Sequence, residues 1–294
     1  WINILTQNYL QSFSTNFLFI EGDINPRHSP QGVGQLYKFE IIFLILGFVG
    51  LYVSRLNKKV KILLLVWLLA APLPAILTRD GGMHATRLFF LLPPLIILLS
   101  LGVIQAIALV PKKAQKLGEI GIGAIYFLGL IIYQHNYWVH YPWESERWWH
   151  AGFKEAIQSA KKVENQYSKI IISTAGEPPW IFFAGWYEYP PDKWHQQFPF
   201  PKTDLQGFGE ISYVDKFYFG TPGLKSGIYS LSEFLSTDTI YIASAKEFNQ
   251  NFIKEPDSLP KNLKMVKAVA YPSGEPVFYL LTLNQDDPGV GGKQ

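Results

Sequence analysis

The sequence contains no cysteine, so neither a disulfide framework nor a thiolate site contributes to this chain. Charge is also scarce, because charged residues make up 17% of the 294 residues, against about 25% in typical soluble domains. This shortage indicates that part of the surface does not face water. The hydrophobic share of 48% excludes a disordered chain. An initiator methionine is absent as well, and a chain that starts at Trp1 is expected to be a fragment that lacks its upstream part.

The charges that are present divide the chain into two unlike halves. Before Tyr137 there are 11 basic and 5 acidic residues, and after it there are 15 and 18, so the halves carry +6 and −3. The basic residues of the first half lie in two short clusters between apolar runs and form no aromatic-studded basic patch. This pattern excludes nucleic acid as a partner.

Four runs in the first half contain no Asp, Glu, Lys or Arg. A helix needs about 20 apolar residues to cross a bilayer, and a soluble helix needs a polar face, which these runs lack. We therefore predict an α-helical membrane region of about four transmembrane helices in place of the alternative, a soluble all-helical core. Glu40 and Arg55, at the ends of the first run, would have to snorkel or face protein. The predicted spans are 39–56, 60–78, 87–110 and 118–138, within a region of residues 39–138.

Two loops between these runs carry only basic charges and predict the orientation. By the positive-inside rule both loops are cytoplasmic. Residues 1–38, the loop 78–87 and everything after residue 139 are then extracytoplasmic, and the chain is predicted to be a multi-pass protein of the plasma membrane. The aromatic residues that follow the fourth run are typical of a membrane interface. The two loops contain Arg55, Lys58, Lys59 and Lys61, and Lys112, Lys113 and Lys116.

The second half has the pattern of a soluble domain, predicted as an extracytoplasmic α/β domain over residues 139–284. Apolar spacing predicts a helix over 151–166. The segment 176–191 is predicted to form a turn followed by a helix, because proline is tolerated in a first helical turn. Short apolar runs predict strands, the last two joined by a Pro-Ser-Gly turn. Trp180, Trp186, Tyr187 and Trp194 stand beside acids and could stack on sugars, but we interpret them as core packing. The predicted strands are 169–174, 216–220, 239–244 and the hairpin 264–283, and the tail 285–294 is predicted to be disordered.

The segment before the first span is predicted to lie on the outer face, as an interfacial helix and a loop within residues 1–38. A helical stripe of Ile4, Tyr9, Phe13 and Phe17 suits the membrane interface. The loop that follows contains Asp23, Arg27, His28 and Ser29 and is rich in glycine. Arg27 and His28 are donors suited to a phosphate oxyanion. A plain turn-rich loop explains the same residues equally well.

A second polar loop lies between the second and third runs. His84 and Arg87 are three residues apart, so a helix that began near Met83 would present both at its amino-terminal end, where an anion is favoured. Arg79 and Asp80 lie in the loop just before them. The alternative is that Arg79 and Arg87 merely anchor the ends of the helices at the headgroups.

Other catalytic signatures are absent from the sequence, including nucleotide-binding glycine loops, zinc-protease motifs and serine-hydrolase elbows. His135, His140 and His150 are interpreted as interfacial histidines, so the sequence assigns no residue to a metal site.

The order of these features resembles the C-type-fold integral membrane glycosyltransferases that use lipid-linked sugars, in particular bacterial relatives of protein O-mannosyltransferases and aminoarabinose transferases. The resemblance rests on the outer segment 8–40, the loop 78–87, the aromatic membrane exit and the segment 176–194. It matches the carboxy-terminal half of such enzymes and runs over most of this chain.

The resemblance implies transfer of a sugar, by an inverting displacement, from a polyprenyl phosphate donor to a protein, glycan or lipid acceptor on the outer face of the membrane. The resemblance implies a general base that is an acidic residue in the first outer loop, which this sequence lacks, so the catalytic residue is expected upstream of Trp1. Neither Asp23 nor Asp80 is assigned as the general base. The resemblance does not decide whether the enzyme uses a divalent metal ion as a cofactor.

The residues predicted to line the lipid-phosphate pocket are Arg27, His28, His84 and Arg87, with Asp23 and Asp80 as secondary candidates. Two alternatives from other classes stay open: a polytopic transporter, and a membrane-anchored scaffold with an external α/β binding domain. A transporter would need a polar pathway through its spans, which these four runs do not contain.

Overall fold

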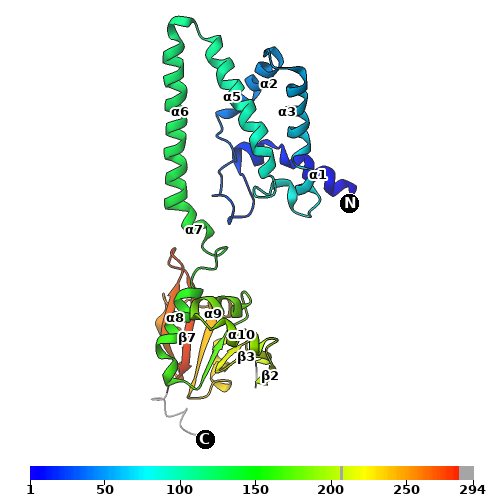
Figure 1. Cartoon of the computed structure of the whole chain (residues 1–294). Coiled ribbons are helices and arrows are strands. Elements are labelled where there is room, and N and C mark those ends of the chain that lie inside the picture. Colours follow the sequence, from blue (N-terminus) through cyan, green and yellow to red (C-terminus); the bar gives the residue numbers. More distant parts are fainter. Residues whose placement is uncertain (206–207, 285–294) are drawn as a thin grey trace. The chain divides into compact units, whose positions relative to one another are not determined.

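The computed structural model describes residues 1–205 and 208–284, and it divides into two compact units, Trp1–Trp148 and Trp149–Gln294 (Figure 1). The first unit is helical and the second is a mixed α/β domain. The sequence placed the start of the second domain at residue 139, ten residues before this division. The tail predicted to be disordered, 285–294, lies outside the described residues.

The first unit contains three helical segments that are long and apolar enough to span a membrane: Lys58–Ile76, Phe89–Leu109 and Lys112–Ser145. They correspond to the second, third and fourth predicted spans. The first predicted span forms the 14-residue helix α2, which is about 21 Å long and so shorter than the roughly 30 Å hydrocarbon core. The α-helices of this unit are α1 Ile2–Ser12, α2 Glu40–Val53, α3 Lys58–Ala70, α4 Leu73–Ile76, α5 Leu92–Leu109, α6 Gln115–His135 and α7 Tyr141–Ser145.

Helices α2 and α5 pack with their backbones in close approach, which two glycines permit. A Cβ on Gly102 would lie 1.7 Å from the carbonyl oxygen of Phe43, and one on Gly47 would lie 2.1 Å from that of Leu98. Leu98 itself is fully buried. Small residues at such crossings are typical of membrane helices, where close van der Waals packing replaces hydrophobic association.

The buried carboxyl group of Glu40 faces protein at the start of α2, which confirms one of the two orientations that its sequence position allowed. Its Oε2 accepts a hydrogen bond from the backbone N–H of Tyr37 at 2.7 Å, and its Oε1 accepts one from the hydroxyl of Tyr126 at 2.8 Å. Tyr126 belongs to α6, so this bond ties α6 to α2. No residue of α6, all of which the structure describes, is buried within the unit.

The basic loops and the two polar loops lie at opposite ends of the helical unit (Figure 1). The loop after α2 and the loop after α5 hold the lysine clusters, and the side chain of Asn57 caps the start of α3 by accepting a bond from the N–H of Lys59. The loops that contain His28 and His84 lie at the other end. The apolar helices therefore separate the lysine clusters from the two polar loops.

Helix α1 buries polar residues against the rest of the unit and leaves part of its apolar stripe exposed, and the place of that stripe at a membrane interface stays a prediction. Ile4 is 41% exposed, whereas the polar residues Asn8 and Ser12 are buried. Asn8 is buried because its side-chain amide donates to the carbonyl oxygens of Ile76 at 3.3 Å and Thr78 at 2.9 Å, at the carboxyl end of α4 and just beyond it.

The second unit is built on one sheet of seven strands in the order β2-β3-β4-β1-β5-β7-β6. The central strand β1 runs parallel to β4 and β5, and the other neighbours are antiparallel. The strands are β1 Lys169–Ile172, β2 Lys202–Leu205, β3 Gly209–Val214, β4 Phe217–Phe219, β5 Thr239–Ser244, β6 Leu263–Ala270 and β7 Pro276–Leu283, and the α-helices are α8 Phe153–Val163, α9 Pro179–Tyr187 and α10 Pro191–Gln197.

The predicted strands and helices of this unit are confirmed, and β2, β3 and α10 were not predicted. Apolar residues on both faces of the sheet form two cores, one of which packs against α8 and α9. Trp180, Tyr187 and Trp194 pack against that core, as the interpretation of core packing requires. Trp186 differs and is 42% exposed.

Candidate functional site

Asp23 is the centre of the polar cluster in the first unit, and its side chain is 1% exposed. One carboxylate oxygen, Oδ1, accepts a hydrogen bond from the backbone N–H of Asn25 at 2.8 Å. The other, Oδ2, accepts one from the N–H of Ala85 at 2.7 Å. Asp23 therefore joins the loop before α2 to the loop before α5.

Two histidines, one from each loop, lie against this carboxylate. The Nδ1 of His28 is 2.9 Å from Asp23 Oδ2, and the Nδ1 of His84 is 3.8 Å from the same oxygen. The two imidazole rings have centroids 4.6 Å apart, with planes tilted by 33°. All three side chains offer a ligand atom, and these atoms lie within 4.8 Å of one another. The sequence had ranked Asp23 below the histidines because nothing in its pattern showed that it would be buried between them.

The loop conformation around Asp23 depends on Gly22, which has a φ of +73°. A Cβ at this position would lie 2.2 Å from the carbonyl oxygen of Val33 and 2.9 Å from the hydroxyl of Ser29. Only glycine combines that backbone conformation with this approach. The glycine therefore lets the loop close on itself and turn the carboxyl group of Asp23 inward.

Arg27 is adjacent to the cluster but its guanidinium group is engaged elsewhere. Its Nε donates to the carbonyl oxygen of Trp148 at 2.6 Å, and its own carbonyl oxygen accepts from the Tyr141 hydroxyl at 3.1 Å. The N–H of Gln31 also donates to Glu144 at 3.2 Å. These bonds fasten the loop to the segment that follows α6.

Arg87 forms an ion pair within its own loop. Its Nη1 lies 2.5 Å from the carboxylate of Asp80 and 2.7 Å from the hydroxyl of Thr78. The hydrogen bond from Arg87 holds the pKa of the Asp80 carboxyl below its usual value. Burial, together with the nearby charge of Arg87, lowers the pKa of His84. His84 is therefore favoured in its neutral form.

The position of His84 and Arg87 differs from the prediction that both lie in the first turn of a helix. The backbone N–H groups of Arg87 and Leu88 donate to the His84 carbonyl oxygen, which makes a turn, and α5 begins only at Leu92. Pro93 and Pro94 explain the late start, because proline is accommodated in a first helical turn but not further inside a helix. A helix dipole therefore does not contribute at His84.

An apolar groove of about 250 Å³ adjoins the His84 loop. Ala85 and Thr86 belong both to that loop and to the lining, and the Thr86 hydroxyl lies 3.0 Å from His84 Nδ1. The rest of the lining is mostly apolar and consists of Phe17, Leu18, Gln35, Leu36, Leu88, Phe89, Leu91, Leu92 and Leu95. A second groove, of about 430 Å³, lies between residues 32–39 and α6.

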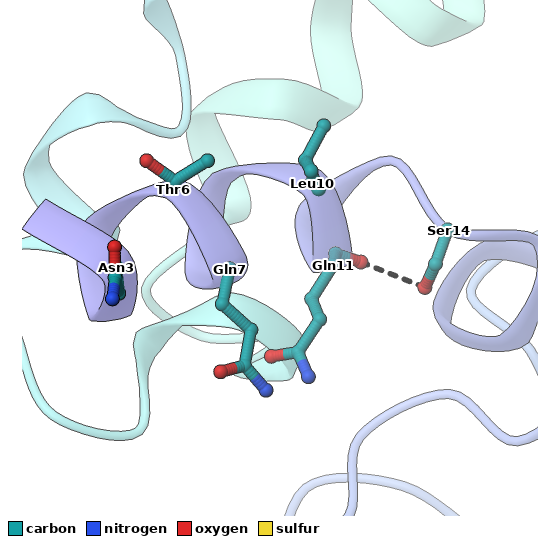
Figure 2. Close-up of a pocket in the computed structure, with 6 residues that line it drawn as sticks. All are labelled: Asn3, Thr6, Gln7, Leu10, Gln11 and Ser14. Atoms are coloured by element: carbon teal, nitrogen blue, oxygen red, sulfur yellow. Dashed lines mark hydrogen bonds between the residues drawn. The ribbon is translucent and has the colours of Figure 1, made fainter.

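A third depression, of about 500 Å³, follows α1 and has a polar lining (Figure 2). Figure 2 shows Gln7 and Gln11 pointing to the same side of the helix, and the hydroxyl of Ser14 donates to the Gln11 carbonyl oxygen at 2.7 Å. The Gln11 amide oxygen lies against Gly82, where a Cβ would be 2.6 Å away. This polar face of α1 therefore borders the loop that carries His84.

Of the six residues that the sequence singled out, the structure brings together Asp23, His28 and His84. Asp80 and Arg87 form a pair in the same loop as His84, and Arg27 bonds to the segment after α6. His135 and His140, interpreted as interfacial, lie on α6 and in the turn after it, with ring centroids 5.2 Å apart. Comparisons with family models, with curated proteins and with solved structures each find no match.

Proposed function

We propose that this chain is the carboxy-terminal part of a membrane glycosyltransferase, which transfers a sugar from a polyprenyl-phosphate donor to an acceptor on the outer face of the membrane. The observation that carries the proposal is the juxtaposition of a polar cluster, built from two loops, with an apolar groove at one end of the apolar helices. A lipid phosphate needs both features, since its head is an anion and its chain is a hydrocarbon.

The polar side of this arrangement suits a departing phosphate. When the glycosidic bond breaks, negative charge develops on the phosphate oxygens and is stabilised by N–H donors and cations. The donors that the two loops offer are the imidazoles of His28 and His84 and the guanidinium group of Arg87. Arg87 keeps a side chain that is 38% exposed, so it can contact a ligand while it holds Asp80.

The apolar side suits a prenyl chain. The groove beside His84 is lined by Leu88, Leu91, Leu92 and Leu95 at the start of α5, so a chain bound there would leave the phosphate next to Thr86 and His84. The amides of Gln7 and Gln11 on α1 provide hydrogen-bond donors and acceptors for sugar hydroxyl groups on the other side of the same loop.

The proposed topology has four spans, with both lysine clusters in the cytoplasm and with the candidate site and the α/β domain outside the membrane. Helix α2 is too short to cross an unperturbed bilayer. Its close packing on α5 nevertheless supports counting it, beside the three longer helices, as the first of the four proposed spans. A reporter fused after Lys59 or Lys113 should be cytoplasmic, and one fused after Asn284 should be external. A cytoplasmic reporter at Asn284 would overturn the proposal.

Turnover of a donor labelled in its sugar tests the function. The complete reading frame that contains this chain is assayed in membrane vesicles, with His84→Ala and Arg87→Ala as variants and Arg79→Ala as the matched control in the same loop. Loss of one donor to a developing anion costs about 100-fold or more in kcat, so both variants should fall by that factor, whereas the control should keep its rate. Unchanged turnover in both variants would refute the site. Lipid movement across the membrane without cleavage of the sugar would identify a transporter.

A further inference from the structure

The geometry of Asp23, His28 and His84 is that of a metal-ligand set. Within the described part of the chain, no other group of three histidine or acidic side chains brings its ligand atoms as close together. Two donors at about 2.0–2.1 Å from a tetrahedral ion are about 3.3 Å apart. The observed separations from Asp23 Oδ2, 2.9 Å to His28 and 3.8 Å to His84, lie on either side of that value.

A simple hydrogen-bonded pair does not account for the third member of this group. His28 is within hydrogen-bonding distance of Asp23, but 3.8 Å is too long for a hydrogen bond from His84. His84 nevertheless points its Nδ1 toward the same oxygen that His28 approaches. His84 Nδ1 also lies 3.0 Å from the Thr86 hydroxyl, and a cation held by these three atoms would take the place of that contact.

We propose that Asp23, His28 and His84 bind one divalent transition-metal ion of the Zn²⁺ type, with a fourth coordination position left for water or a ligand oxygen. Two imidazole nitrogens and one carboxylate oxygen favour such an ion over Mg²⁺ or Ca²⁺, which take oxygen ligands. The carboxylate is held in place by the N–H groups of Asn25 and Ala85.

The site joins two segments that are distant in sequence, so metal binding has a structural consequence. His28 lies in the loop before α2, and His84 lies in the loop before α5. An ion bound to both would stabilise the folded first unit, because a ligand that binds only the folded state raises its stability. This assignment stands on geometry and does not rest on sugar transfer.

Metal titration of the chain in detergent micelles tests the proposal. After treatment with a chelator, the protein is titrated with Zn²⁺ in competition with a fluorescent chelator, and separately with Co²⁺, whose visible absorption reports its ligands. The variants are His28→Gln and His84→Gln. The double variant His135→Gln/His140→Gln removes the other close histidine pair of the first unit, at the end of α6 and in the segment after it, and serves as the matched control.

We expect one Zn²⁺ per chain and a rise in the thermal unfolding temperature on binding. Each single variant should lose at least about 100-fold in affinity for Zn²⁺, since mutation of residues that only hydrogen-bond to metal ligands already lowers metal affinity by about 10–100-fold. The control should bind as the unaltered chain does. Circular dichroism establishes that the variants are folded, and if one fails to fold, the other decides. Failure of the unaltered chain to bind, or affinity unchanged in a folded His84→Gln chain, would overturn the proposal.

Discussion

The imidazole rings of His28 and His84 lie with their centroids 4.6 Å apart, although they come from loops that precede different helices. Asp23 joins them, because its carboxylate contacts His28 directly and accepts the N–H of Ala85, the residue after His84. A stable candidate site therefore requires both loops to hold their shape, and the predictions below address the contacts that hold the loops and helices together.

Gly22→Ala should destabilise the first unit more than Gly32→Ala does. Both glycines have positive φ, +73° and +69°, so both substitutions incur about 1–2 kcal/mol of backbone strain. Only at Gly22 would the new Cβ meet other atoms, the nearest being the carbonyl oxygen of Val33 at 2.2 Å. Thermal unfolding in micelles measures the difference. Equal losses in the two variants would contradict the close packing of this loop.

Gly102→Ala should loosen the contact between α2 and α5 and lower the unfolding temperature, because its Cβ would overlap the backbone of Phe43. Gly121→Ala on α6 is the matched control, since no atom lies within 4 Å of a Cβ there. Alanine favours helix over glycine by up to about 1 kcal/mol, so the control should be neutral or slightly more stable. A Gly102→Ala chain as stable as the control would show that α2 does not pack on α5 in this way.

Tyr126→Phe should cost about 1–3 kcal/mol, because it removes the hydrogen bond to the buried carboxyl group of Glu40. Tyr133→Phe, a substitution of the same kind on the same helix, should cost less. The free energy of unfolding in a mixed-micelle titration compares the two. Adding Glu40→Gln to Tyr126→Phe should recover part of the loss, because an amide is less costly to bury than a carboxyl group that has lost one of its two hydrogen-bond donors. Full additivity of these two substitutions would contradict a direct bond between Glu40 and Tyr126.

Glu247 should make the second unit relatively more stable at lower pH. Burial raises the pKa of its carboxyl above the ordinary 4.5, although it accepts bonds from the hydroxyl of Tyr241 and the N–H of Ser244. The folded state therefore holds the proton more tightly, and this contribution is complete below pH 4.5 and is lost as the pH rises through the raised value. As the pH rises through the raised pKa of Glu247, the second unit of the Glu247→Gln variant should become more stable relative to that of the unaltered chain.

Amide hydrogen exchange in β5 and β7 across this pH range measures the effect, with the exposed Glu177→Gln as control. The control should follow the unaltered chain at every pH. A Glu247→Gln chain that does the same would show that the Glu247 carboxyl is not perturbed.

Hydrophobic runs predicted much of the fold, and the reasons are local. Charge-free runs marked α2, α3, α5 and α6, and short apolar runs marked β1, β4, β5, β6 and β7. Strand β2, Lys202–Leu205, was missed because its sequence is polar and its strand state depends on pairing with β3. The start of α5 was placed too early, since the effect of Pro93 and Pro94 on the preceding turn was not taken into account.

The candidate site was predictable only in its parts. His28 and His84 stood out as polar residues in short loops, and their residue types indicated the binding of an anion. Their meeting depends on how α2 packs on α5 and on the turn at Gly22, which are tertiary features. For the same reason the burial of Asp23, and the bonds that hold Arg27 and Arg87, could not be read from spacing.

The measurement that tests the central claim most directly is cross-linking with a photoreactive polyprenyl phosphate, followed by mass spectrometry of the labelled peptides. With the photoreactive group next to the phosphate, the account predicts labelling within residues 84–95 that unlabelled polyprenyl phosphate competes away and that His84→Ala reduces, while Arg79→Ala leaves it unchanged. Labelling spread along the exposed surface of α6, or confined to the α/β domain, would contradict a donor site at the Asp23, His28 and His84 cluster.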